Sequence, residues 1–295
     1  MIPERRYYRS WQGLLTQAQE PSRFNVSHAR ESGGHALKFR GTRTWDDAVR
    51  LATEGYHEGA ERATALVEPF ALRIAREIQR SEIIFDVTGT ELDIGRFLTQ
   101  DPEHWMDWSY GEQLDEYEDD YEPEGVRLIR LVVNVGAASD VAAEPIMARG
   151  AWVVGLVKLL EHAGHRCEIV SVLASRHDGS DLEIWATIKE AGAQLDANRV
   201  AFALAHPSML RRMYFAVMES LDAPLSDRCE HGYGHPIEVA EANIQESDIY
   251  LGKLTATGTG SWTDQDRASA WLLLQLRRAG VKLTTNRREE ASVRA

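Results

Sequence analysis

One strand–helix–strand pattern in the middle of the chain restricts the fold most. An apolar run at residues 126–135 leads into a loop of small residues at 136–140, which predicts a buried strand followed by a turn. A helix is expected from about residue 145 to residue 163, and a second strand at 167–173. Two strands joined by a helix form a parallel pair, so this pattern predicts an α/β fold. Such folds bind their ligands at the carboxyl ends of the strands.

The loop at the carboxyl end of the first strand lacks the acidic side chain that many ligand sites use there. It offers Asn134, Gly136, Ala138 and Ser139, and its first carboxylate is that of Asp140. The segment therefore predicts a fold class but does not by itself predict a catalytic activity.

The rest of the second half alternates between strand and helix patterns. Repeated alternation predicts a three-layer sandwich, with a mainly parallel sheet covered by helices on both faces, over residues 125–285. Strands are expected at 199–204 and 248–254, and helices at 181–192, 207–220 and 263–279.

The first half predicts a smaller, mixed α+β region over residues 1–111. Thr44 and Asp47 have the spacing of a capping box, so a helix should begin there, and Gly55 should end it. Residues 112–124 carry eight acids in thirteen positions, which predicts an acidic linker or loop between the two regions. Residues 286–295 are expected to form a flexible tail.

Composition argues against two classes of partner. The net charge is −13 and the isoelectric point about 5.3, whereas nucleic-acid binding depends largely on neutralising phosphates with basic side chains. The pairs Arg211–Arg212 and Arg277–Arg278 are expected on solvated helix faces. No apolar run reaches the roughly 18 residues of a membrane helix, and two cysteines are too few for a disulfide framework. We therefore expect a soluble, cytoplasmic protein that binds neither nucleic acid nor a membrane.

The order of elements in residues 125–285, together with Arg149-Gly-Ala and Leu159-Leu-Glu-His-Ala-Gly-His165 in the first helix, resembles a von Willebrand factor A domain. In that family the first strand ends in Asp-x-Ser-x-Ser, which binds a divalent cation. The pattern falls here on Asn134, Gly136 and Ala138, so the resemblance implies a degenerate metal-ion site. It also implies a binding face for a protein partner, such as an AAA-type ATPase, at one sheet edge. The residues expected on that edge are Asn134, Gly136, Ser139, Asp140, Thr257 and Thr259.

The whole chain is also similar to an uncharacterised family encoded by bacteriophages and some bacteria. The resembling segments are Gly41-Thr-Arg-Thr-Trp-Asp-Asp-Ala48, Phe85-Asp-Val-Thr-Gly89, Gly95-Arg-Phe-Leu98, Asp101-Pro-Glu103, and Arg149-Gly-Ala151 with Leu160-Glu-His-Ala-Gly-His165. This resemblance implies a phage genome and the cytoplasm of a bacterial host, but no catalytic residues.

A second cluster offers metal chemistry instead. Cys229, His231 and His235 lie within seven residues, and thiolate and imidazole are the usual ligands of zinc. The glycines at 232 and 234 are equally typical of a simple tight turn. This cluster supports an alternative function, a zinc-dependent hydrolase, in which zinc or another divalent cation would be the cofactor.

Two further motifs lack parts that their chemistry requires. The glycine-rich loop at 255–263 has no lysine that would make it a nucleotide-binding P-loop. His206 and Ser208 stand together, but the Gly-x-Ser-x-Gly pattern of a nucleophile elbow is missing. The leading hypothesis is a non-enzymatic protein–protein interaction module without a cofactor. The alternatives are the zinc hydrolase and a virion or assembly component.

Overall fold

The computed structural model divides the chain into two compact units. Residues 1–68 and 126–279 form the larger unit, and residues 69–125 and 280–295 form the smaller one. The structure describes residues 3–79, 81–86, 91–92, 105–110, 127–177, 179–223, 225–229 and 232–281. The expected acidic linker at 112–124 and the expected tail at 286–295 lie outside these ranges.

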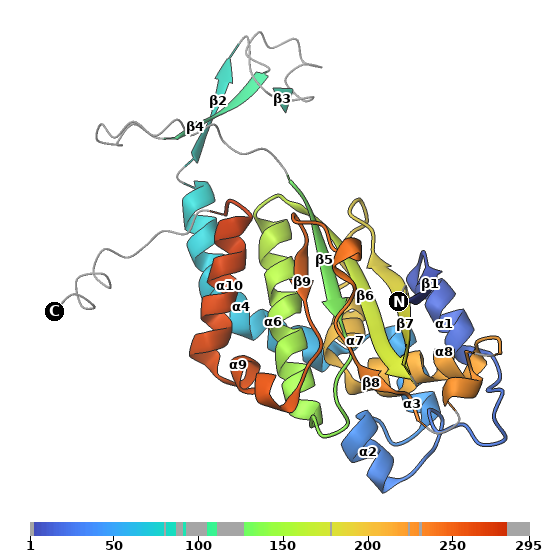
Figure 1. The fold of residues 1–295 in the computed structure, drawn as a ribbon. Helices are drawn as coiled ribbons and strands as arrows, with labels where there is room; N and C mark the ends of the chain where they lie inside the picture. Colours follow the sequence, from blue (N-terminus) through green and yellow to red (C-terminus); the bar gives the residue numbers. More distant parts are fainter. Residues whose placement is uncertain are drawn as a thin grey trace. The chain divides into compact units, whose positions relative to one another are not determined.

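The larger unit contains a six-stranded, mostly parallel sheet (Figure 1). Its strand order is β1-β7-β6-β5-β9, and β8 pairs with β6. The pairs β1–β7, β5–β6 and β5–β9 are parallel, whereas β7 and β8 run antiparallel to β6. The strands are β1 (Glu4–Tyr8), β5 (Leu128–Asn134), β6 (Arg166–His177), β7 (Ser180–Lys189), β8 (His235–Pro236) and β9 (Ile249–Leu251). The α/β class expected from the sequence is confirmed.

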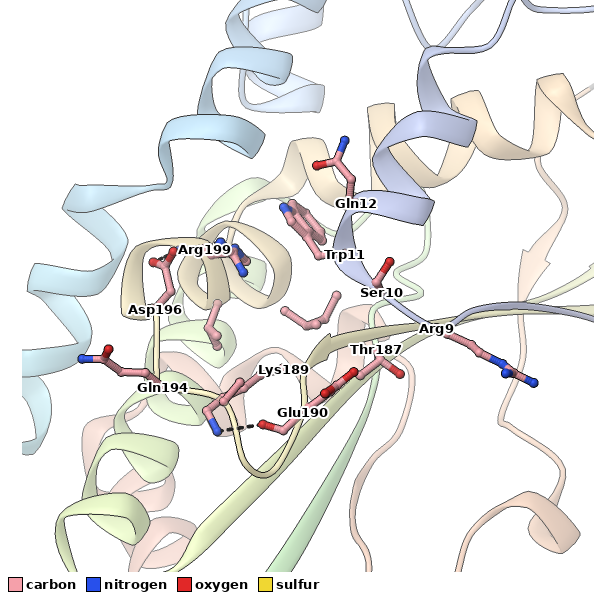
Figure 2. A pocket seen from close by; sticks show the side chains of 13 residues that line it. Arg9, Ser10, Trp11, Gln12, Thr187, Lys189, Glu190, Gln194, Asp196 and Arg199 are labelled. Carbon is pink, nitrogen blue, oxygen red and sulfur yellow. Dashed lines mark hydrogen bonds and ion pairs between the residues drawn. The ribbon is translucent and has the colours of Figure 1, made fainter.

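Helices pack around this sheet and connect its strands. They are α1 (Trp11–Gln19), α2 (Gly34–Arg40), α3 (Trp45–Glu54), α6 (Ala143–His162), α7 (Ala197–Ala205), α8 (Phe215–Ser220), α9 (Gly260–Thr263) and α10 (Gln265–Arg278). A π-helix, η1 (Met209–Tyr214), precedes α8, and short 3₁₀ turns are η2 (Asp227–Cys229), η3 (Glu241–Asn243) and η4 (Ala256–Gly258). The carboxyl ends of β1 and β7 lead toward the starts of α1 and α7, which border one pocket (Figure 2).

The smaller unit contains an antiparallel sheet of order β2-β4-β3. Its strands are β2 (Ser81–Asp86), β3 (Glu91–Leu92) and β4 (Trp105–Tyr110). Helix α4 (His57–Gln79) begins in the larger unit and ends in the smaller one, with Pro69 at the boundary.

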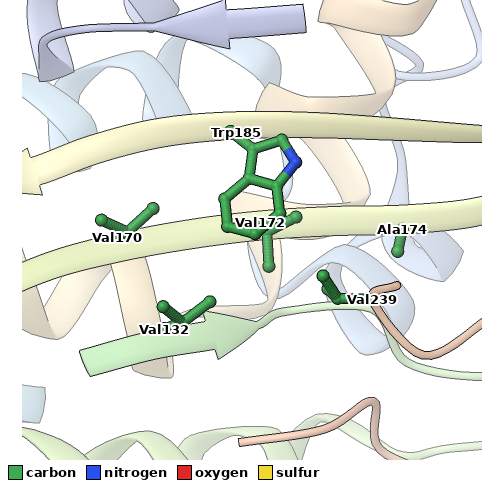
Figure 3. Packing of buried hydrophobic residues seen from close by; sticks show 6 residues of the cluster. All are labelled: Val132, Val170, Val172, Ala174, Trp185 and Val239. Carbon is green, nitrogen blue, oxygen red and sulfur yellow. The ribbon is translucent and has the colours of Figure 1, made fainter. Parts of the chain in front are cut away.

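The two faces of the main sheet are covered differently. On one face, Ser171 of β6 shares a hydrogen bond of 2.8 Å with Tyr214 of the π-helix, and Lys189 of β7 forms an ion pair with Glu161 of α6. On the other face, Val239 and the partly buried Ile237 and Ile244 pack on the sheet, so the segment that precedes β9 covers it, and the partly buried Tyr250 of β9 also packs there. The buried cluster on that face is Val132, Val170, Val172, Ala174, Trp185 and Val239 (Figure 3).

Two predicted elements are wrong in type. Residues 181–192 were expected to be helical, but Ser180–Lys189 is strand β7, paired with β6 across a turn at Gly179. Residues 199–204 were expected to be a strand, but they lie in helix α7, which Asp196 caps by accepting the Arg199 N–H. Residues 200–205 are an apolar run, and in β7 even Glu183 and Lys189 are buried, so burial on nearly all sides hides the period that separates the two structures.

The expected boundary between an N-terminal region at 1–111 and an α/β domain at 125–285 also differs from the observed division. Residues 4–8 form β1, which is a strand of the main sheet, and α1 and α3 pack on α8 and α7. The first 68 residues therefore belong to the same unit as residues 126–279.

Candidate functional site at the switch point of the sheet

The strand order reverses beside β5. From β5 the chain continues to β6 and β7 on one side, and it returns to β9 on the other side. The crevice at the carboxyl ends of two such strands, a topological switch point, is the usual ligand site of an open α/β sheet. We call residues 135–142, after β5, and 252–259, after β9, the switch-point loops.

The switch-point loops are joined to each other through their backbones. Ala137 and Leu254 form a parallel β-bridge. The Leu254 N–H donates to the Gly136 carbonyl at 2.8 Å, and the Ala138 N–H donates to the Leu254 carbonyl at 3.1 Å. The two loops therefore act as one rigid edge.

Asn134, the first residue expected on a partner-binding edge, is fully buried. Its amide nitrogen donates to the Ile237 carbonyl at 2.9 Å, and its amide oxygen accepts the Gly136 N–H at 3.0 Å. A Cβ on Gly136 would lie 2.9 Å from that oxygen and 3.2 Å from the Pro236 Cβ. Asn134 and Gly136 are therefore internal supports of the edge and are not part of its surface.

The guanidinium of Arg149, on α6, lies at the carboxyl ends of β5 and β9. It donates to the Asn134 carbonyl at 3.1 Å and to the Gly252 carbonyl at 2.9 Å, and only 2% of the residue is exposed. Burial lowers the pKa of Arg149 to about 10, while Tyr250 and Glu238 act in the opposite direction. The side chain is therefore charged at neutral pH, and this cation holds the carbonyl ends of both strands.

Tyr250 and Glu238 form a hydrogen-bonded pair beside the switch-point loops. The Tyr250 hydroxyl donates to a Glu238 carboxylate oxygen at 2.7 Å and accepts the Val239 N–H at 3.2 Å. Burial, together with the Glu238 contact, raises the pKa of Tyr250 to about 12, so it is protonated at neutral pH. The Lys253 ammonium donates to the Pro236 carbonyl at 2.9 Å. The polar groups beside the ends of β5 and β9 thus satisfy one another.

The outer residues of the edge carry its accessible polar groups. Ser139, Asp140 and Thr257 are exposed, whereas Thr259 is half-buried and donates its hydroxyl to the Ala256 carbonyl at 2.8 Å. Underneath lies a small apolar cluster of Val141, Ile146, Leu254, Ala137, Ala138 and Trp262. Four of the six predicted edge residues therefore lie at the rim of the site, and two lie inside it.

Arg211 and Arg212 were expected on a solvated helix face, and that expectation is wrong. Both belong to the π-helix and are at most 1% exposed. Arg211 donates to the Val141 carbonyl of one switch-point loop and to the Phe39 carbonyl of α2 at 2.7 Å. Arg212 donates to the carbonyls of Ala29, Glu31 and Thr42. The pair lies inside because segment 29–42 wraps over this helix and offers carbonyl oxygens to it.

Arg277 and Arg278, by contrast, are exposed as expected.

The structure does not assemble the predicted zinc ligands within the residues it describes. Cys229 is buried and its thiol donates to the Leu225 carbonyl at 3.7 Å, whereas His235 is exposed on β8. His231 lies outside the described residues. Across the described ranges, no group of three or more His, Cys, Asp and Glu side chains is placed to hold a metal ion.

His206 and Ser208 are buried but are not arranged as base and nucleophile. The His206 Nδ1 accepts the backbone N–H of Ser208 at 3.2 Å, while the Ser208 hydroxyl donates to the Arg40 carbonyl at 2.6 Å. Burial lowers the pKa of His206 to about 4. Both side chains therefore serve the junction between α7, the π-helix and α2.

Comparison with known proteins identifies a family. The family described as Domain of unknown function (DUF7192) matches residues 3–282. No curated protein and no solved structure matches the chain. No helix in the described part of the chain is long and apolar enough to span a membrane.

Proposed function

This chain belongs to the family described as Domain of unknown function (DUF7192), and we propose from its geometry that the protein is a non-enzymatic module. The module would bind a protein partner through the switch-point loops. The observation that carries the proposal is the guanidinium of Arg149, which donates to the carbonyls of Asn134 and Gly252 at the base of the switch-point loops. The buried polar groups at the ends of β5 and β9 already bond to one another, so they have little to offer a small ligand. The exposed rim of Ser139, Asp140 and Thr257 remains available to a macromolecule.

The rigidity of the edge supports the same proposal. Backbone hydrogen bonds join the two loops, Arg211 anchors one of them, and an apolar cluster lies beneath both. A preorganised surface loses little conformational freedom on binding, and this favours affinity for a partner of matching shape.

We further propose that the larger unit is a divergent von Willebrand factor A-like domain. Its parallel β5–α6–β6 unit and the position of Asn134 at the end of β5 support this reading. The segment that precedes β9 would take the place of one helix layer of the expected three-layer sandwich. The internal cation Arg149 would stand where related domains hold a metal ion, so partner binding would not require a divalent cation. An AAA-type ATPase is the partner that this resemblance suggests, and a phage-encoded origin remains part of the proposal.

The test is recovery of a partner on the tagged protein from cells that express it naturally, with and without a chelator. We expect one stoichiometric partner that is retained in the chelator. Asp140→Arg and Thr257→Arg place a bulky charge on the exposed rim and should each reduce recovery at least tenfold. Thr16→Arg, at an exposed position on α1, is the matched control and should recover the partner normally.

Three outcomes would contradict the proposal. Equal recovery with the rim variants and with the control would exclude the switch-point loops as the contact. Loss of the partner in chelator would show that a metal ion is required. Stoichiometric zinc with no partner would favour the alternative hydrolase, and recovery only with assembled particles would favour the virion component.

A further inference from the structure

A pocket lies at the opposite end of the sheet from the switch-point loops. β7 runs antiparallel to β6. The carboxyl ends of the parallel pair β1 and β7 therefore lie at that opposite end of the sheet. The pocket there has a volume of about 300 Å³, which is at the lower end of the range for small-molecule sites. Its position at the ends of two parallel strands is one that α/β folds use for ligands.

The floor of the pocket is apolar. Trp11 points between α1 and α7 (Figure 2), and Ile188 and Val200 also line the pocket. Trp11 is 8% exposed, and its indole N–H donates to the Ala52 carbonyl at 3.3 Å, which fixes the ring. A fixed aromatic ring beside two branched aliphatic side chains suits an apolar group of similar size.

Most of the charges around the pocket are already paired. The Lys189 ammonium lies 2.7 Å from a Glu161 oxygen and donates to the Cys167 carbonyl at 3.0 Å. The Arg199 guanidinium lies 3.3 Å from an Asp196 oxygen. These two cations are therefore occupied by internal partners.

Two charges of opposite sign remain. Arg9 and Glu190 both line the pocket and are both exposed. Neither forms an ion pair with any residue that the structure describes. Arg9 extends outward from the rim in Figure 2, so its side chain would turn back over the opening to meet a ligand. An unpaired cation and an unpaired anion above an apolar floor match a zwitterion with an apolar body.

We propose that this pocket binds a free amino acid with a large apolar side chain. The ligand carboxylate would pair with Arg9, its ammonium with Glu190, and its side chain would lie against Trp11. This site is separate from the switch-point loops, so it adds a small-molecule ligand to the proposed interaction module and can be tested without a protein partner.

The test is isothermal titration of the full chain with L-phenylalanine and two truncated analogues. 3-Phenylpropionate lacks the ammonium and 2-phenylethylamine lacks the carboxylate, so each loses one of the two ion pairs. We expect both analogues to bind about tenfold more weakly than phenylalanine, as the loss of one charge-assisted contact predicts. Ala193→Trp, at an exposed lining position, should abolish binding of all three.

Substitutions of Arg9 and Glu190 should change the affinities for the two analogues in opposite patterns. Arg9→Ala should weaken phenylalanine and phenylpropionate about tenfold but leave phenylethylamine unchanged, and Glu190→Gln should give the reverse pattern. Arg23→Ala, an exposed arginine that pairs with Asp222 away from the pocket, is the matched control. Absence of phenylalanine binding at millimolar concentration would overturn the proposal, as would equal affinity for phenylalanine and phenylpropionate.

Discussion

Buried arginines that bind backbone carbonyls recur in this molecule. Arg149, Arg211 and Arg212 each donate to carbonyl oxygens of segments that are distant in sequence. Guanidinium suits this role because it offers five donors in a fixed plane and stays charged in a buried site. Each arginine thus fixes backbone carbonyls in loops and at the ends of helices or strands.

Replacing Arg149 with methionine should destabilise the protein by about 2–4 kcal/mol. The variant leaves the buried carbonyl of Asn134 and the partly buried carbonyl of Gly252 without this donor, and unsatisfied buried groups cost about 1–3 kcal/mol each. Urea unfolding followed by circular dichroism measures the change. Arg277→Met, at an exposed site on α10, should change the free energy of unfolding by no more than about 0.5 kcal/mol. Equal effects of the two substitutions would show that the contacts of Arg149 are not needed.

Some of this site could be predicted at the level of single residues. The sequence placed Asn134, Ser139 and Asp140 at the end of a buried strand, and that is where they lie. It did not show that Asn134 points inward, because its partner Ile237 is about a hundred residues away. Arg149 stands in the otherwise apolar stretch 145–157 of α6, which was a visible signal of a buried polar contact, although its acceptors could not be read from the sequence.

At the scale of elements, sequence patterns predicted the structure correctly where a side chain bonds to backbone only a few residues away. The predicted capping box is present: Thr44 accepts the Asp47 N–H and Asp47 accepts the Thr44 N–H, both at 3.1 Å. The strand–helix–strand unit from β5 to β6 is also as expected. The sequence did not show that β7 is a strand and α7 a helix, because each is buried on nearly all sides. The spacing of apolar and polar residues then no longer separates the two structures, and packing against neighbouring elements determines them.

Helix α6 depends on glycine where it crosses α7. A Cβ on Gly150 would lie 2.2 Å from the Ala205 Cα and 2.5 Å from the Leu204 carbonyl oxygen, and both are backbone atoms. Gly150→Ala should therefore destabilise the protein by about 1–3 kcal/mol through overpacking, although alanine favours an isolated helix by about 1 kcal/mol. Thermal and urea unfolding test this. Gly260→Ala, in α9 with open space around it, is the control and should be neutral or slightly stabilising. A stabilised Gly150→Ala variant would contradict the close packing.

At the scale of the whole molecule, the N-terminal segment completes the main unit. β1 supplies a strand of the sheet, and α1 buries Trp11, Leu14, Leu15 and Ala18. The carboxylate of Glu219, which is 1% exposed, accepts the Ala29 N–H and hydroxyl donors from Ser27 and Tyr233. Sequence patterns could not predict that the N-terminal segment packs with the second half of the chain, because these contacts join residues nearly two hundred positions apart.

A fragment of residues 126–295 should therefore fail to fold as a stable domain. Without the first 68 residues, β7 loses its partner β1, and Arg212 loses the carbonyls of Ala29, Glu31 and Thr42. Glu219 would also keep a buried charge without two of its three donors, which is costly away from water. We expect low solubility and loss of the sharp unfolding transition, measured by circular dichroism and calorimetry. Adding a separate fragment of residues 1–68 should restore the transition in part, because it supplies the missing strand, helices and carbonyls. A cooperative transition of the 126–295 fragment alone would show that the second half forms its own core, which is the division that the sequence suggested.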